Sequence, residues 1–271
     1  MKRIKFRSLS SGSNGNCYFL GIFSEEGACE TGIIIDTGVS PRRFKKEMAR
    51  EGIGFGDIDA ILITHDHHDH VGSLGSYCKH IGLPVYSTRK LMGRLLATQR
   101  YGTYLGPWAN MLDEGWNEIV PGRIKVQYFE VPHDATQTVG YAIMLDDYKF
   151  VIMTDVGRMV PQGISFASAA DTVVVESNYD PEMLFNGPYP PELQVRISDG
   201  HGHMSNRECA EAVRAFDHEG LQNVFLCHLS EHNNTPELAM AATRPVLDAS
   251  VRVCPLPRMT PSPMFDISKR Q

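Results

Sequence analysis

The stretch from Ala60 to His70 reads AILITHDHHDH and decides the expected fold. Its first four residues are apolar and predict a short buried β-strand. The six residues after the threonine are all His or Asp. Imidazole and carboxylate groups are costly to bury unless they are paired or bind a metal, although a solvated His/Asp loop is the alternative. Neutral imidazoles combined with a carboxylate suit Zn²⁺, Mn²⁺ or Fe, so the segment predicts a metal site at the end of a strand.

Composition excludes several other classes of protein. The chain has 271 residues, of which 42% are hydrophobic and 21% charged, and its formal net charge is −6. This charge argues against a protein that coats nucleic acid non-specifically, although divalent metals would reverse the local sign at an active site. Six cysteines without a C-x-x-C pair predict free thiols. The N-terminal MKRIKFRSLS has no apolar core of a signal peptide, and no run is long enough to span a membrane, so we expect a cytoplasmic protein.

Short apolar strands alternate with amphipathic helices along the chain, which predicts an α/β (α+β) fold. We expect a single domain over residues 1–271, with a short disordered or extended tail after about residue 257. Residues 71–81 predict a helix. Residues 101–118 and 181–191, which are rich in Gly, aromatic residues or Pro, are expected to be irregular loops, with Trp108 and Trp116 in the core.

The segment SSGSNGN, residues 10–16, lies between two predicted strands. Its turn-forming residues predict either a plain hairpin turn or a loop whose NH and OH groups face a phosphate.

Four more apolar strands are followed by a His or Asp residue. These residues are Asp36 after GIII, His133 after QYFEVP, Asp155 after FVIMT and His228 after VFLC. Neighbouring parallel strands bring their carboxyl ends to one edge of a sheet, which is where α/β proteins place their sites. We therefore expect these side chains to join those of the His-rich segment.

The number of ligands fits two divalent metal ions that share a carboxylate. The expected ligands of the first ion are His65, His67 and His133. The expected ligands of the second ion are Asp69, His70 and His228. Asp155 is expected to bridge both ions, and Asp36 to accept a hydrogen bond from a ligand histidine.

The His-x-His-x-Asp-His signature, with the later His, Asp and His, resembles that of the metallo-β-lactamase superfamily over residues 4–235. The resemblance implies a four-layer αββα sandwich. The segments SLSSGSNGNC, ITHDHHDHVG, VESNYD, NGPYP, GHMSN and CHLSEHNNTPE are similar to the bacterial YycJ (WalJ) branch. Members of that branch are regarded as DNA exonucleases that act from the 5′ end, and they have been tied to mismatch repair.

Substrate-binding residues are expected at two further places. Gly-His-Met-Ser at residues 202–205 precedes a predicted helix, whose N-terminus attracts phosphate, and it resembles a Gly-His-x-Ser motif of nuclease relatives. We therefore expect His203 and Ser205 to bind phosphate, and the resemblance implies that His203 contacts the scissile phosphate. The residues expected to bind a 5′-terminal phosphate are Ser11, Ser13, Asn14 and Asn178.

The expected function is a dinuclear-metal phosphodiesterase, a DNA exonuclease acting from the 5′ end with a hydroxide between the two ions as nucleophile. Asp69 would orient this hydroxide, and His203 would stabilise charge on the phosphoryl oxygens. The alternatives are an RNA or cyclic-phosphate phosphodiesterase, a thioester hydrolase on the same fold, and a metal-stabilised binding protein without turnover. An oxidoreductase is disfavoured because di-iron relatives carry a carboxylate where this chain has His67.

Overall fold

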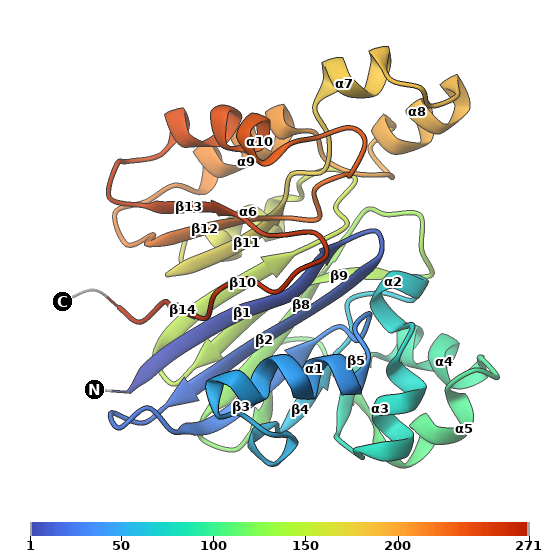
Figure 1. Ribbon diagram of the computed structural model, residues 1–271, viewed down its shortest axis with the longest axis vertical. Coiled ribbons are helices and arrows are strands. Elements are labelled where there is room, and N and C mark those ends of the chain that lie inside the picture. The colour runs from blue at the N-terminus through green and yellow to red at the C-terminus, as the bar shows by residue number, and fades with distance from the viewer. Residues whose placement is uncertain (1, 270–271) are drawn as a thin grey trace.

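Two seven-stranded β-sheets pack face to face in the computed structural model, which describes residues 2–269, and helices cover the outer face of each sheet (Figure 1). The first sheet has the order β14 (Phe265–Asp266), β1 (Arg3–Gly12), β2 (Gly15–Phe23), β3 (Cys29–Ile35), β4 (Ala60–Leu62), β5 (Val85–Thr88) and β6 (Ala109–Leu112). The second has the order β13 (Arg252–Pro255), β12 (Asn223–Cys227), β11 (Thr172–Glu176), β10 (Tyr148–Met153), β9 (Thr138–Leu145), β8 (Ile124–Val131) and β7 (Asn117–Val120). The expected αββα sandwich is confirmed.

The helices divide between the two outer faces. Those against the first sheet are α1 (Pro41–Met48), α2 (His68–Val71), α3 (Leu74–His80), α4 (Arg89–Ala97) and α5 (Gly102–Leu105). Those against the second sheet are α6 (Pro161–Ala167), α9 (Asn206–Phe216) and α10 (Pro236–Thr243). The helices α7 (Pro181–Asn186) and α8 (Pro191–Ser198) project from the upper right of Figure 1. Single 3₁₀ turns cover Ala49–Glu51, Phe55–Asp57, Gly106–Trp108 and Arg244–Val246.

An apolar core fills the space between the sheets. Phe6 of the first sheet contacts Phe150 and Phe225 of the second, with ring centroids 5.4 and 5.0 Å apart. All three side chains are fully buried, and each burial contributes about 1.5–3 kcal/mol. Because helices cover the other face as well, the central strands are buried on both sides, which explains their continuous apolar runs.

Strand direction brings the predicted site residues together. Strands β3 to β6 are mutually parallel, as are β10 to β13, and β8 runs in the direction of β10 because both are antiparallel to β9. The sheets are joined near the end of β4, where the Tyr141 hydroxyl donates to the Ile63 carbonyl (2.6 Å) and Val139 N donates to the Thr64 carbonyl (3.0 Å). The carboxyl ends of strands from both sheets therefore meet at one edge of the sandwich.

Several segments expected to be irregular are regular. β1 and β2 extend through residues 10–16 and leave only a two-residue turn, so this segment forms a tight hairpin. Residues 101–118 contain α5, β6 and the start of β7, and Trp116 is 47% exposed, so the expected loop and the burial of this tryptophan are wrong. Trp108 packs against the core beneath α3 to α5, as expected.

The expectation of a proline-rich loop over residues 181–191 is also wrong. Proline occupies the first position of α7 and of α8, where a backbone N–H would have no hydrogen-bond partner within the helix. The helix expected over residues 71–81 is divided, because α2 ends at Val71 and α3 starts at Leu74.

The tail after residue 257 is extended and bound to the domain over the part that the structure describes. Arg258 donates to the carbonyls of Leu229 (3.0 Å) and Asn234 (2.7 Å), and Ser262 N donates to Ser8 O (2.8 Å). β14 then pairs with β1. Residues 258–269 thus form an extended segment that is bound to the domain; the last two residues lie outside the described chain.

All six cysteines are free thiols, as expected, and four of them are buried. Within residues 2–269, no helix has the length and apolar character needed to cross a bilayer.

Candidate metal centre

Three strand ends turn into the site through left-handed backbone. Asp36 after β3, Asp155 after β10 and His228 after β12 have φ angles of 60°, 55° and 54°. This conformation costs a residue with a Cβ of order 1–3 kcal/mol and persists where the surrounding structure enforces it. The only other described non-glycine residue with positive φ is Asp146, in the β9–β10 hairpin. The strain is thus concentrated on residues predicted to form the site.

The His-rich segment after β4 sends its side chains in two directions. His65 and His70 are fully buried, whereas His68 is exposed and lies 3.1 Å from Arg100 Nη1. The Asp66 carboxylate accepts hydrogen bonds from Thr136 N and Oγ1. These contacts explain why Asp66 and His68 do not join the predicted ligands.

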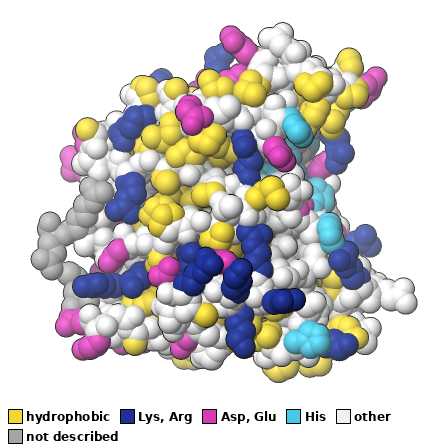
Figure 2. Space-filling model, in the orientation of Figure 1, with side chains coloured by type: hydrophobic (Ala, Val, Ile, Leu, Met, Phe, Trp, Pro, Cys, Tyr) yellow, Lys and Arg dark blue, Asp and Glu magenta, His cyan; other side chains and the backbone are white. Residues whose placement is uncertain are grey.

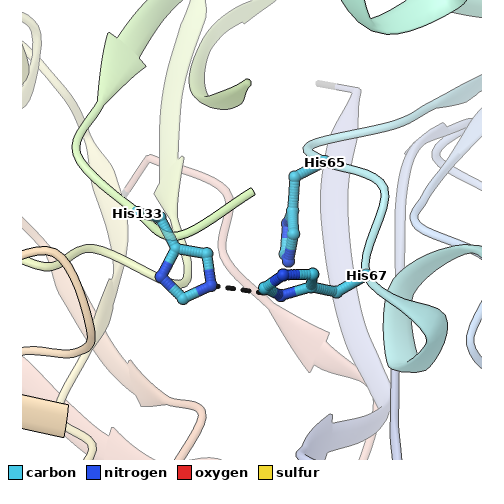
Figure 3. Close-up of side chains that lie close together, drawn as sticks. All are labelled: His65, His67 and His133. Carbon is cyan, nitrogen blue, oxygen red and sulfur yellow. Dashed lines mark hydrogen bonds between the residues drawn. The ribbon is translucent and has the colours of Figure 1, made fainter. Parts of the chain in front are cut away.

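The imidazoles of His65, His67 and His133 converge from two segments (Figure 3). One nitrogen of each lies within 4.8 Å of the other two, and His67 Nδ1 is 3.3 Å from His133 Nε2. This is the group predicted to hold the first ion.

The outer nitrogen of each of these imidazoles has its own partner. His133 Nδ1 lies 2.7 Å from the Gly202 carbonyl, and His67 Nε2 lies 3.2 Å from the Asp134 carbonyl. His65 Nδ1 lies 3.1 Å from the Thr64 hydroxyl. An N–H that donates outwards leaves the inner nitrogen with a free lone pair. The network therefore leaves Nε2 of His65 and His133, and Nδ1 of His67, as the atoms that could bind a metal ion.

The predicted ligands of the second ion, Asp69, His70 and His228, also offer atoms within 4.8 Å of one another. His70 Nδ1 donates to Asp36 Oδ2 over 2.7 Å, and Asp36 also accepts from Thr64 N and Oγ1. Asp36 is thus placed to fix the orientation of His70.

Asp155 lies between the two groups. Its Oδ2 is 3.1 Å from His70 Nε2, and its Oδ1 is 3.6 Å from His133 Nε2. Oδ1 also lies 3.6 Å from His228 Nδ1, so Asp155 is within reach of residues of both clusters and would be placed to bridge two ions.

The chemistry of these groups fits divalent cations. His65 Nε2 and His228 Nε2 are buried without a hydrogen-bond partner among the described residues, a state that costs about 1–3 kcal/mol for each atom. Burial, and then the neighbouring His70, lowers the pKa of His65 well below its usual value, so this imidazole is neutral. Burial opposes ionisation of Asp155, but His228 and His70 hold the pKa of this carboxyl well below its usual range. Imidazole nitrogens and carboxylate oxygens are donors that suit Zn²⁺, Mn²⁺ and Fe alike.

Sequence reasoning missed Glu176, the last residue of β11. Its fully buried carboxylate accepts hydrogen bonds from His203 Nδ1 (2.7 Å), His228 Nδ1 (3.0 Å), Val156 N (2.7 Å) and Met204 N (3.3 Å). Burial would lower the pKa of His203, but the Glu176 carboxylate outweighs it and raises this pKa. The signal was present, because Glu176 ends an apolar strand just as Asp36 and Asp155 follow theirs.

A pocket of about 280 Å³ opens over the two clusters. Of the residues expected to bind phosphate, Ser13, Asn178 and His203 line it. Sequence reasoning missed further residues of its lining, among them Asp134, Tyr189, Leu193, Arg196, Ile197 and Ser230.

Three residues expected to bind phosphate lie elsewhere. The Ser11 hydroxyl is fully buried, accepts from His228 N (2.9 Å) and contacts the Tyr18 hydroxyl, so it supports His228 from behind. The Ser205 hydroxyl accepts from Glu208 N at the start of α9 and donates to the Glu208 carboxylate. Its hydrogen bonds are therefore made within the capping box of the helix. Asn14 lies at a separate small cavity of about 20 Å³.

A helix-covered double sheet with clustered His and Asp side chains at one edge defines a metal-dependent hydrolase. A family model described as "Beta-lactamase superfamily domain" matches residues 31–229. The chain belongs to the metallo-β-lactamase superfamily.

Two relatives are similar over most of their length. Exodeoxyribonuclease WalJ of Streptococcus pneumoniae is 31% identical over 87% of this chain and 85% of its own. Exodeoxyribonuclease YycJ of Bacillus anthracis is 30% identical over 90% of this chain and 89% of its own. The metallo-β-lactamase fold protein YhfI of Bacillus subtilis shares the fold, with a TM-score of 0.70, 15% identity, and coverage of 97% of this chain and 100% of its own.

Proposed function

We propose that this protein is a dinuclear metal-dependent exodeoxyribonuclease that removes nucleotides from the 5′ end of DNA. The observation that carries the proposal is the placement of two three-ligand clusters on either side of Asp155, beneath a pocket that His203 also lines. The relatives named exodeoxyribonuclease support DNA as the substrate. Zn²⁺, Mn²⁺ and Fe remain the candidate ions, because all three accept this donor set.

When bound, two divalent cations supply an acidified water as nucleophile and neutralise charge on the phosphate. The chain's own residues complete the site. His203 is held by Glu176 through Nδ1 and lines the pocket, and its raised pKa favours the imidazolium that donates to a phosphoryl oxygen. Asp69 has a pKa far below its usual range and accepts from Asn16 Nδ2 (3.0 Å), so it stays an oriented acceptor for the attacking water.

The 5′ end requires groups that bind a terminal phosphate. Ser13, Asn178 and Ser230 line the pocket and are the residues we assign to this role. Asn178 Nδ2 also donates to the His228 carbonyl (2.8 Å), which fixes its amide close to the second cluster. A volume of about 280 Å³ is at the lower limit of ordinary ligand pockets, so it takes about one nucleotide.

The test is a nuclease assay on purified protein that has been stripped of metal and reloaded with Mn²⁺ or Zn²⁺. Linear duplexes labelled at the 3′ end should give a ladder of progressively shorter labelled products, while closed circular DNA stays intact. DNA with a 5′-phosphate should be cleaved faster than DNA with a 5′-hydroxyl. Equal rates would contradict a pocket for the terminal phosphate. Preferred hydrolysis of RNA, a cyclic phosphate or a thioester would replace the proposed substrate.

A further inference from the structure

One wall of the pocket is apolar and comes from the projecting α7–α8 segment. Tyr189 lies between the two helices, and Leu193 and Ile197 follow on α8; all three line the pocket and are partly exposed. None of the eight residues of α8 is buried. The apolar side chains on this wall therefore add nothing to the core, and the hydrolytic chemistry described above does not use them.

Tyr189 is held in a fixed place with part of its ring free. Pro188 and Pro190 flank it and restrict its backbone, and Gln194 Nε2 donates to its carbonyl (3.0 Å). Its ring meets that of His232 edge to face, with centroids 6.1 Å apart and an interplanar angle of 69°. Such a contact covers at most one face of the tyrosine ring. Tyr189 also lines the pocket, so part of its side chain is available to a ligand there, and because its backbone is already restricted, binding costs little entropy.

The wall is tied to the reacting groups. His203 N donates to the Ile197 carbonyl (2.8 Å), and Arg196 Nε donates to Asp134 Oδ2 (2.7 Å). Gly202 lies so close to the carbonyls of Arg196 and Ile197 that a Cβ would overlap them. A group resting on Tyr189 is therefore held at a defined position relative to the histidines of the site.

We propose that Tyr189, Leu193 and Ile197 form a subsite for the nucleobase of the 5′-terminal nucleotide. The inference rests on the proposed function, since it names the part of the DNA that this wall receives. Every base has a flat apolar face, so stacking on Tyr189 accepts all four bases without reading sequence. A base can reach the ring only after it leaves its own pair and stack. Ends with an unpaired terminal base are therefore better substrates than fully paired ends.

The outer face of the same segment supplies a matched control. Phe185 is 54% exposed and does not line the pocket. Hydrophobic side chains gather over α7 and α8 at the upper right of Figure 2. Phe185→Leu, like Tyr189→Leu, replaces an aromatic ring with an aliphatic side chain, in the same segment but away from the cavity.

The first experiment measures binding without turnover. A duplex carries 2-aminopurine as its unpaired 5′-terminal base and a cleavage-resistant phosphorothioate at the first linkages, and it is titrated with the Mn²⁺-loaded protein. Quenching of 2-aminopurine is expected with the unaltered protein, with Tyr189→Phe, which keeps the ring, and with Phe185→Leu. Tyr189→Leu should lose the quenching and weaken binding roughly ten-fold, as expected for one lost stacking contact.

The second experiment compares cleavage of DNA that has either an ordinary or an abasic 5′-terminal nucleotide. Tyr189→Leu should raise KM roughly ten-fold on the ordinary end and leave KM unchanged on the abasic end, because that end has no base to stack. An equal loss on both ends, or quenching that survives in Tyr189→Leu, would overturn the subsite. The abasic end tests the unaltered protein as well, so the inference does not depend on the variant's folding. Quenching without any DNA cleavage would keep the subsite and reject the proposed nuclease.

Discussion

Glu176→Gln tests whether one buried carboxylate organises the candidate site. Oε1 of Glu176 accepts from His203 Nδ1 and His228 Nδ1, and Oε2 accepts from Val156 N and Met204 N. Glutamine has one carbonyl oxygen, so either orientation of its amide places an NH₂ group against two N–H donors. His228 can relieve this clash only by moving its proton to Nε2, which removes the lone pair that faces Asp69 and the predicted second ion.

Two effects follow from this geometry. If the protons stay in place, two buried donors lose their acceptor, each at a cost of about 1–3 kcal/mol, so the free energy of unfolding falls by about 2 kcal/mol or more. If His228 changes tautomer, metal affinity falls instead, by roughly 10–100-fold, which is typical for loss of the group that orients a ligand. Either outcome lowers DNA cleavage.

Urea unfolding in the presence of a chelator measures the first effect, and competition with a chromophoric chelator measures the second. Glu211→Gln is the control, because its exposed side chain on α9 pairs with Arg207 at the surface, and loss of its charge should change stability by less than about 0.5 kcal/mol. A Glu176→Gln variant with unchanged unfolding midpoint and unchanged metal affinity would refute the reasoning.

Three further predictions concern the metals and the packing around them. His67→Ala should abolish cleavage and release one metal ion per chain in elemental analysis, and turnover retained with a single ion would contradict two-metal catalysis. Chelation should lower the melting temperature reversibly, since a ligand at one hundred times its Kd stabilises the folded protein by about 2.7 kcal/mol. A melting temperature that does not change with chelator would contradict cation binding at His65 and His228. Gly202→Ala should lower the free energy of unfolding by about 1–3 kcal/mol in urea, because the new Cβ pushes the loop away from α8. It should also reduce cleavage, because the shift removes the Gly202 carbonyl from His133. Unchanged stability would contradict the packing described.

A group of basic side chains lies on α1, outside the pocket. Figure 2 shows Lys and Arg side chains over α1, where Arg42, Lys45 and Lys46 are exposed. None of the three lines the pocket, so a solvated outer face accounts for them. The chain's net charge of −6 agrees with a protein that engages DNA at a metal centre rather than over a broad basic surface.

The sequence was informative wherever chemistry and chain direction coincide locally. His65 to His70 follow a buried strand, and Asp36, Asp155 and His228 each follow another, so parallel strand ends were enough to predict that these groups meet. The same reasoning missed Glu176, although it also ends an apolar strand, and only the tertiary structure shows its contacts with His203 and His228. Prolines in the α7–α8 segment suggested a loop because the first position of a helix tolerates proline as readily as a turn does.

By itself the sequence determined which residues supply imidazole and carboxylate and which strands carry them, since these follow from residue type and from hydrophobic runs a few residues long. Only the tertiary structure decided which nitrogen of each histidine faces inward, that Ser11 and Ser205 support the fold rather than the substrate, and that Tyr189 reaches the pocket. These features depend on contacts between segments far apart in the chain. Such contacts form only when the two sheets pack together, so they cannot be predicted from a local sequence pattern.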